Sequence, residues 1–260
     1  MALIAMAIHD TEDNGRDVFT ERTLASIDRT VDFVFSNHRF FAIINAATPR
    51  TRAALEKYHW VNVIEMPDNV GTAKAVNQAW KLRRPGEHAV KMDNDVVISQ
   101  PGWVEQMQEA IARDPKIGII GLKRIDCCQN PKHPEPFYSS KLKFVPDENT
   151  FGRPWIVVEE TADVMGTCTM FNSALLEKIG FLYQPGLYGF DDVLACVRSI
   201  QAGHYNCFLH GFHIDHIDPG GTVYQDWKGY HAMRYSADYH QIKDEYQTGK
   251  RPLWCDADYE

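Results

Sequence analysis

Short apolar runs alternate with amphipathic helical patterns through the first half of this chain of 260 residues. Such runs predict buried strands, and apolar residues three or four apart predict helices that cover them. Alternation at this pace is typical of a parallel sheet with crossover helices, so the sequence predicts an α/β fold with a doubly wound sheet. The predicted strands are residues 3–8, 40–44, 61–65, 88–92 and 117–122, and the predicted helices are residues 20–31, 71–82, 101–113 and a segment that begins at Thr48-Pro49.

The regular alternation ends after Lys123, and a long irregular stretch over 127–154 follows. Loops of this length inside a compact domain are usually functional. Regular patterns then return as a predicted strand over 161–171, helices over 173–179 and 191–202, and an extended run or strand pair over 205–217. We divide the chain into residues 1–122, 123–222 and an aromatic tail over 223–260, all within one continuous domain.

Composition excludes several classes of protein. Hydrophobic residues are 44% and charged residues 24% of the chain, which are ordinary globular values and exclude a mainly disordered chain. The net charge of −8 disfavours a broad nucleic-acid-binding surface. The six cysteines show no CxxC spacing, so we expect reduced thiols and a cytoplasmic protein. The apolar start over 1–8 is short and has no basic stretch before it, so we expect no signal peptide and no integral membrane segment.

Asp93-Asn94-Asp95 is the sharpest motif, because it directly follows a predicted buried strand. Ligands of parallel α/β sheets bind beyond the carboxyl ends of the strands. Two carboxylates one residue apart can share a hard divalent cation there, and the cation would neutralise a diphosphate. The alternative is an Asx-type turn that merely ends the strand.

A second motif runs from Asn69 through Gly71 to Asn77 at the start of a predicted helix. Gly71 would let the backbone approach a phosphate or a base, because free N–H groups at a helix start favour anions. The alternative is an ordinary helix entry that is capped by Thr72.

Asp191 and Asp192 begin another predicted helix, and the helix dipole would keep their carboxylates ionised. An ionised carboxylate beside a cleft can act as a general base, although acidic residues also suit a helix start for purely structural reasons. Further along, His213 and His216 lie in an extended run, and His216 could complete a metal site with Asp95. Their spacing does not support a helical zinc site.

The order of these motifs resembles that of the family 2 glycosyltransferases, over about Leu3 to Thr222. The matching segments are Asn69-x-Gly71 with Asn77, Asp93-Asn94-Asp95, Pro101-Gly102-Trp103, Gly166 to Phe171, Leu175 to Phe181, Tyr188 to Arg198, and the late His216.

The resemblance implies a GT-A fold, in which a Rossmann-like, mostly parallel sheet flanked by helices carries a fused acceptor-binding half. Residues 1–122 would bind the nucleotide sugar, and residues 123–222 would bind the acceptor and carry the catalytic base. The implied reaction is inverting transfer of a sugar from a nucleotide-diphosphate sugar, with UDP-sugar as the expected donor, to a hydroxyl group of a soluble acceptor. The implied cofactor is Mn²⁺ or Mg²⁺.

The resemblance also implies roles for particular residues. Asp192 would be the catalytic base, with Asp191 as the second candidate. The implied metal-binding residues are Asp95, His216 and Asp93. The implied nucleotide-binding residues are His9, Asp10, Thr11, Asn45, Asn69, Gly71, Asn77, Asp93 and Asn94.

The chain departs from the family pattern at three positions. Asp191-Asp192 stands where the family usually has Glu-Asp, and Leu194 replaces an acidic residue that often follows. Asn45 ends the second predicted strand, where an Asp usually reads the nucleotide base.

Three alternatives remain. A sugar-phosphate nucleotidylyltransferase would need a Gly-rich loop after the first strand, and the acidic loop from His9 to Arg16 matches it poorly. A non-catalytic nucleotide- or glycan-binding module would be expected to lack the metal motif or the base. A transferase that acts on a modified base in nucleic acid would bind it with the cations and aromatic residues that are interleaved over 123–155. The simpler interpretation of this segment is a solvated loop beside a glycan, protein or small-molecule acceptor. The sequence leaves the oligomeric state open.

Overall fold

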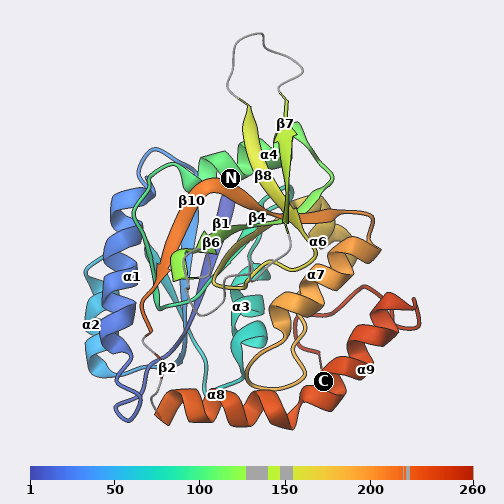
Figure 1. The fold of residues 1–260 in the computed structure, drawn as a ribbon. Helices are drawn as coiled ribbons and strands as arrows, with labels where there is room; N and C mark the ends of the chain where they lie inside the picture. Colours follow the sequence, from blue (N-terminus) through green and yellow to red (C-terminus); the bar gives the residue numbers. More distant parts are fainter. Residues whose placement is uncertain (127–139, 147–154, 219, 221–222, 260) are drawn as a thin grey trace.

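The computed structural model describes residues 1–126, 140–146, 155–218, 220 and 223–259. Within these residues, ten strands form one sheet in the order β3-β2-β1-β4-β9-β6-β10-β8-β7, with the short strand β5 paired to β10 (Figure 1). Strands β3, β2, β1 and β4 run parallel, whereas β9 and β8 join their neighbours in antiparallel fashion. One sheet therefore passes through both halves of the chain.

The strands are β1 (Ala2–His9), β2 (Arg39–Ala46), β3 (Val61–Glu65), β4 (His88–Met92), β5 (Val96–Ile98), β6 (Ile117–Arg124), β7 (Ser140–Val145), β8 (Ile156–Thr161), β9 (Cys168–Phe171) and β10 (Tyr205–His216). The helices are α1 (Asp17–Thr30), α2 (Pro49–Glu56), α3 (Thr72–Trp80), α4 (Trp103–Arg113), α6 (Ser173–Ile179), α7 (Asp191–Gln201), α8 (Val223–Arg234) and α9 (Ser236–Gln247). Among the described helices, none is both long enough and apolar enough to cross a bilayer.

Alternate side chains of the central strands pack into two cores, one on each face of the sheet. Ile4 and Met6 of β1 point into a core that α1, α2 and α4 complete, whereas Leu3 and Ala5 point into a core with α3, α6 and α7. This two-sided burial explains why β1 reads as a continuous apolar run. The predicted α/β fold with helices on both faces is confirmed.

Most of the predicted elements match the structure to within a few residues, and β3, β4 and α6 have the predicted bounds. Thr48 caps α2 by accepting a hydrogen bond from the amide of Thr51, as the Thr-Pro start indicates. One expectation was wrong: the predicted strand over 161–171 is the end of β8, a non-strand connection and β9. Of the two alternatives for residues 205–217, the extended run is confirmed as the single strand β10, and the tail contains two helices, α8 and α9, which were not predicted from the sequence.

The C-terminal segment is tied to the body of the protein by a buried arginine. Arg198 of α7 is fully buried, and its guanidinium group donates hydrogen bonds to the carbonyls of Ile179, Phe181 and Leu253. Tyr246 of α9 lies beside it, with the guanidinium carbon 5.6 Å from the ring centre. Arg198 therefore joins α7, the end of α6 and the last residues of the chain.

We expect Arg198→Met to lower the free energy of unfolding by about 3 kcal/mol or more, because it leaves buried carbonyls without donors. Urea unfolding followed by circular dichroism measures this loss. Arg52→Met is the control: the side chain of Arg52 forms a surface ion pair with Glu65, so this substitution should cost no more than about 0.5 kcal/mol. Equal unfolding midpoints for the two variants would contradict the role of Arg198.

Candidate active site

A cavity of about 440 Å³ opens where β1 and β4 end, and Tyr224 and Lys228 of α8 line it on one side. Eight of the predicted site residues line it, namely His9, Asn45, Asp93, Asn94, Asp95, Asp191, Asp192 and His216. Four cations that the motifs did not single out, Arg16, Lys91, Arg124 and Lys228, also line the cavity. The structure therefore brings the metal motif, the acidic pair and the late histidine to one place.

The Asp93-Asn94-Asp95 turn is held rigidly from behind. The side-chain amide of Asn94 donates hydrogen bonds to Asp10 and to Thr20, at 2.7 Å each. The amide of Asp93 donates to the carbonyl of Thr167, and the carbonyl of Asp95 accepts from the amide of Ile217. These bonds fix the backbone between β4 and β5 and leave the two carboxylates directed into the cavity.

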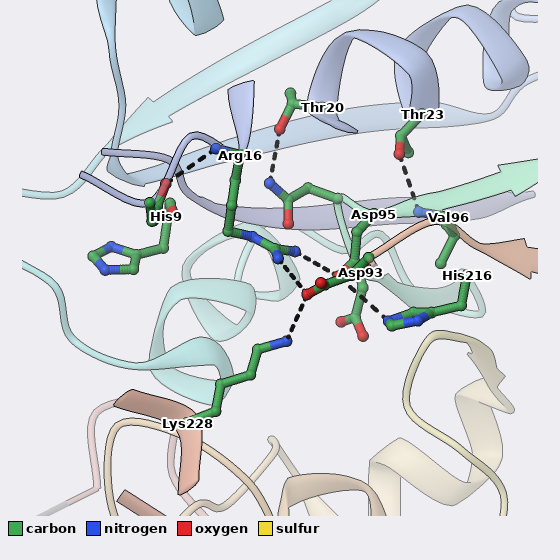
Figure 2. A network of polar contacts seen from close by, with 12 residues as sticks. His9, Arg16, Thr20, Thr23, Asp93, Asp95, Val96, His216 and Lys228 are labelled. Atoms are coloured by element: carbon green, nitrogen blue, oxygen red, sulfur yellow. Dashed lines mark hydrogen bonds and ion pairs between the residues drawn. The ribbon is translucent and has the colours of Figure 1, made fainter. Parts of the chain in front are cut away.

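Arg16 and His216 converge on Asp95, as Figure 2 shows. A terminal nitrogen of Arg16 lies 2.5 Å from Asp95 Oδ2, and His216 Nε2 lies 3.4 Å from the same oxygen. Burial opposes ionisation of Asp95, but the hydrogen bond from His216 and the charges of His216 and Arg16 hold its pKa below the usual range. Asp95 is therefore a buried anion at neutral pH.

Lys91 lies under the cavity and connects the two halves of the site. Its ammonium nitrogen lies 3.2 Å from a carboxylate oxygen of Asp93 and 3.2 Å from one of Asp191. It also donates a hydrogen bond to the carbonyl of Gly166. A side chain at Gly166 would collide with Lys91, since an added Cβ would stand 2.6 Å from its nitrogen. Glycine at this position therefore allows the close packing of β4 against the acidic pair.

Asp192 differs from Asp191 in its environment. Its two oxygens accept hydrogen bonds from the amides of Gly166 and Val193, whereas Asp191 pairs with Lys91. Burial and the neighbouring charge of Asp191 raise the pKa of Asp192 to about 6, against the opposing charge of Lys91. A carboxylate with this pKa is ionised at neutral pH and is a stronger proton acceptor than an ordinary aspartate.

The backbone immediately before the acidic pair is unusual. Phe190 has a φ of 71°, a left-handed conformation that costs energy for a residue with a side chain. Its ring stacks on Tyr239 of α9 at 4.2 Å between centroids. The C-terminal helix thus stabilises the turn that aims Asp191 and Asp192.

Five predicted nucleotide-binding residues lie outside the cavity lining, namely Asp10, Thr11, Asn69, Gly71 and Asn77. Asp10 is fully buried and accepts hydrogen bonds from Thr20, Thr51 and Asn94, so it supports the metal motif from behind. The side chain of Thr11 forms a local turn with Asn14. The role predicted for these two residues is not supported by their position.

The side chains of the motif from Asn69 to Asn77 form hydrogen bonds within the protein. Asn69 accepts a hydrogen bond from the side chain of Asn45, and Asn77 binds the backbone of Leu182 and Ala257. A Cβ at Gly71 would stand 3.0 Å from Leu187, and Gln184 accepts from the amide of Ala73 at the start of α3. Gly71 itself lies outside the cavity lining, although the next residue, Thr72, lines it, so a role of this helix start in phosphate binding stays a prediction.

Helix α8 supplies an aromatic wall that the sequence motifs did not locate. Tyr224 and Trp227 stack on each other with ring centroids 5.5 Å apart, and the ring of His9 lies 5.5 Å from that of Trp227. Lys228 lies 4.7 Å from the ring centre of Tyr224. The abundance of aromatic residues in the tail was the sequence signal for this helix, but it did not indicate where the tail lies relative to the cavity.

The side chains at Asp95 suit a cation that the protein and a bound ligand would hold together. Asp95 Oδ1 is buried and has no hydrogen-bond partner among the described residues, and His216 lies beside the other oxygen. In the described part of the chain, no three His, Cys, Asp or Glu side chains gather closely enough to hold a metal ion alone. The residues present fit a divalent cation that takes its remaining ligands from a bound molecule.

The model of the glycosyl transferase family 2 matches residues 18–180, which is more than half of the chain. No curated protein sequence matches this chain. Solved structures share the fold at low identity. The mannosyltransferase PcManGT from Pyrobaculum calidifontis, in complex with GDP-Man and Mn²⁺, has a TM-score of 0.64 at 16% identity, over 92% of this chain and 64% of that chain.

Two further structures extend the comparison. S. aureus TarS 1–349 in complex with UDP-GlcNAc has a TM-score of 0.57 at 17% identity, over 96% of this chain and 71% of that chain. GalNAc-T7 with UDP, GalNAc and Mn²⁺ has a TM-score of 0.58 at 12% identity, over 84% of this chain and 44% of that chain. This chain thus spans less than two thirds of PcManGT and of GalNAc-T7. The family match, on a sheet that presents Asp93-Asn94-Asp95 at the end of β4, shows that the chain belongs to the glycosyl transferase family 2.

Proposed function

We propose that this protein is an inverting glycosyltransferase that moves a sugar from a nucleotide-diphosphate sugar to a hydroxyl group of an acceptor. One observation carries the proposal: Asp95 with His216, and Asp192, line the same cavity although they come from different parts of the chain. A cation site beside a raised-pKa carboxylate suits a reaction in which one group leaves as an anion and another loses a proton. Residues 1–122 bind the donor, and residues 123–222 bind the acceptor.

The donor occupies the side of the cavity that His9 and Asn45 line. His9 lies at the end of β1 against Trp227, so a base there would meet aromatic surfaces. Asn45 already bonds with Asn69 and with the amide of Val70, which fixes its orientation beside the cavity. Asp93 is directed to the ribose or to water on the metal, and Asn94 holds the turn.

Asp95 and His216 would hold Mn²⁺ or Mg²⁺. When bound, such an ion stabilises the negative charge of the leaving diphosphate as a Lewis acid. Asp192 accepts the proton of the acceptor hydroxyl while that oxygen attacks the anomeric carbon from the face opposite the diphosphate, which inverts the configuration. Asp191 is held by Lys91 and serves the orientation of the pair, which supports Asp192 as the base.

A donor screen tests the proposed function. Wild-type protein with Mn²⁺ is heated with a panel of UDP- and GDP-sugars, and transfer of labelled sugar is measured with those that raise the melting temperature. PcManGT and TarS were solved with GDP-Man and UDP-GlcNAc respectively, so both bases belong in the panel. We expect a UDP-sugar to give the larger shift. If no nucleotide sugar shifts the melting temperature, the proposed function is wrong.

The acceptor is proposed to be a glycan, a protein or a small molecule in the cytoplasm. The alternative of a nucleic-acid acceptor depends on cations in the second half. Of the six cations over 123–155, three have carboxylate partners: Lys123 pairs with Glu159, Arg124 with Asp126 and Lys143 with Asp114. Lys141 is exposed, while Lys132 and Arg153, with the aromatic residues Phe137 and Tyr138, lie outside the described residues. Cations that already have carboxylate partners contribute little to a phosphate-binding groove. This pairing favours the other acceptors.

We expect His216→Ala to weaken Mn²⁺ binding and nucleotide binding together by roughly 10–100-fold, the usual effect of losing a partner at a metal site. Calorimetric titrations of both ligands measure it. His213→Ala is the matched control, because His213 lies on the same strand but outside the cavity lining. A larger loss in His213→Ala would reverse the assignment.

A further inference from the structure

Arg16 lies at the centre of the network around Asp95, although no sequence motif assigns it a role in a transferase. It follows β1 in the loop before α1, and only 3% of its surface is exposed. One terminal nitrogen lies 2.5 Å from Asp95 Oδ2 (Figure 2), and the other lies 2.6 Å from Asp218 Oδ2. Buried hydrogen bonds between ionised groups of this kind are strong, so Arg16 holds both carboxylates firmly.

Helix α8 fixes Arg16 from a third direction. The guanidinium carbon lies 4.4 Å from the ring centre of Tyr224, a cation–π contact. Lys228 reaches from the same helix to within 3.5 Å of Asp218 Oδ2. The loop after β1, the turn after β4, the segment after β10 and α8 therefore all meet at Arg16.

The network around Arg16 includes two groups of the proposed cation site. Asp95 supplies a carboxylate, and His216 supplies an imidazole nitrogen 3.4 Å from Asp95 Oδ2. Mn²⁺ readily accepts both kinds of ligand. The guanidinium group neutralises the same carboxylate that would attract the ion, so the two cations compete for Asp95.

We propose that Arg16 is a resident cation that occupies Asp95 and that a divalent metal ion has to displace. The inference rests on the proposed function for the metal-binding role of Asp95. When Asp95 binds a metal ion instead of Arg16, the guanidinium group still contacts Asp218 and the ring of Tyr224. The buried charge of Arg16 therefore remains paired. The resident arginine therefore holds down the affinity of the protein for the metal ion alone.

The test is binding of Mn²⁺ without nucleotide, followed by the electron paramagnetic resonance signal of free Mn²⁺. We expect Arg16→Met to bind Mn²⁺ roughly 10–100-fold more tightly than wild type, the size of a lost charged hydrogen bond. The double variant Arg16→Met with Asp95→Asn should lose this gain, which locates it at Asp95. Arg52→Met, which removes an exposed arginine outside the cavity lining, should bind like wild type.

Unchanged or weaker Mn²⁺ binding in Arg16→Met would overturn the proposal, as would a gain that persists in the double variant. If Arg16→Met does not fold, Arg16→Lys is used, because lysine keeps the charge but cannot bridge two carboxylates with a planar fork. We then expect Mn²⁺ to bind more tightly than to wild type, and no gain overturns the proposal. These outcomes are independent of the donor screen. If the wild type binds a nucleotide sugar but Arg16→Met shows no gain in Mn²⁺ affinity, the proposed role of Arg16 is wrong and the proposed function stands.

Discussion

Asp192→Asn is expected to lower kcat by about 10²–10⁴-fold, the usual contribution of a general base. The amide keeps the shape of the side chain and can still accept hydrogen bonds from the amides of Gly166 and Val193, but it does not take a proton as a carboxylate does. Binding of the donor and of Mn²⁺ should change little, because Asp192 accepts its hydrogen bonds from Gly166 and Val193 and is not part of the pair formed by Asp95 and His216. The measurement is the transfer rate at saturating donor, beside calorimetric titration of the nucleotide.

The pH profile gives a second readout of the same residue. The pKa of Asp192 is raised to about 6, and the base works in its deprotonated form. The wild-type rate should therefore be constant above neutral pH and fall tenfold per pH unit well below pH 6. This acidic limb should disappear from the residual activity of Asp192→Asn.

Asp191→Asn is the matched control. Asp191 is paired with Lys91, so its replacement should disturb the orientation of the pair and cost less in kcat than Asp192→Asn. Near-normal turnover in Asp192→Asn, or a larger loss in Asp191→Asn, would reject the assignment of the base. Loss of nucleotide binding instead of turnover would point to a structural role for Asp192.

The central sheet was predictable because its signals are local. Short apolar runs indicate buried parallel strands, and β4, in which four of five residues are buried, was recognised with its true bounds. β3 also has its predicted bounds, although it is an edge strand with no buried residue. The hairpin of β7 and β8 was missed, and β7 is an edge strand whose alternating apolar residues Leu142 and Phe144 are exposed, so no buried face marks it. Helix α8 was missed for the same reason, since none of its residues is buried.

The site was predictable where its residues follow directly from strand ends or a helix start. Asp93, Asp95 and Asp192 are of this kind, and all three line the cavity. Arg16 was not predictable, because its partner Asp218 lies 202 residues away and only the folded chain brings them together. Asn77 was predicted to bind the nucleotide because it stands at a motif position. In the structure its side-chain amide instead donates hydrogen bonds to the carbonyls of Leu182 and Ala257.

Removal of the divalent cation is expected to have an effect of the same size as loss of the base. We expect excess EDTA, or Asp95→Asn, to lower transfer by about 10²–10⁴-fold, because a bound cation contributes several kcal/mol to the stabilisation of the leaving diphosphate. Added Mn²⁺ should restore the wild type after EDTA but not Asp95→Asn. Activity that is unchanged in excess chelator would contradict metal dependence.

The two treatments together separate a metal effect from a structural one. Asp95→Asn is nearly isosteric, and Arg16 keeps its contact with Asp218, so the turn after β4 should retain its shape. If both treatments act by removing the same ion, EDTA should lower the residual activity of Asp95→Asn no further, because effects on one interaction are not additive. An additional loss of similar size in EDTA would mean that Asp95 acts in catalysis independently of the metal ion, as the ion-pair partner of Arg16.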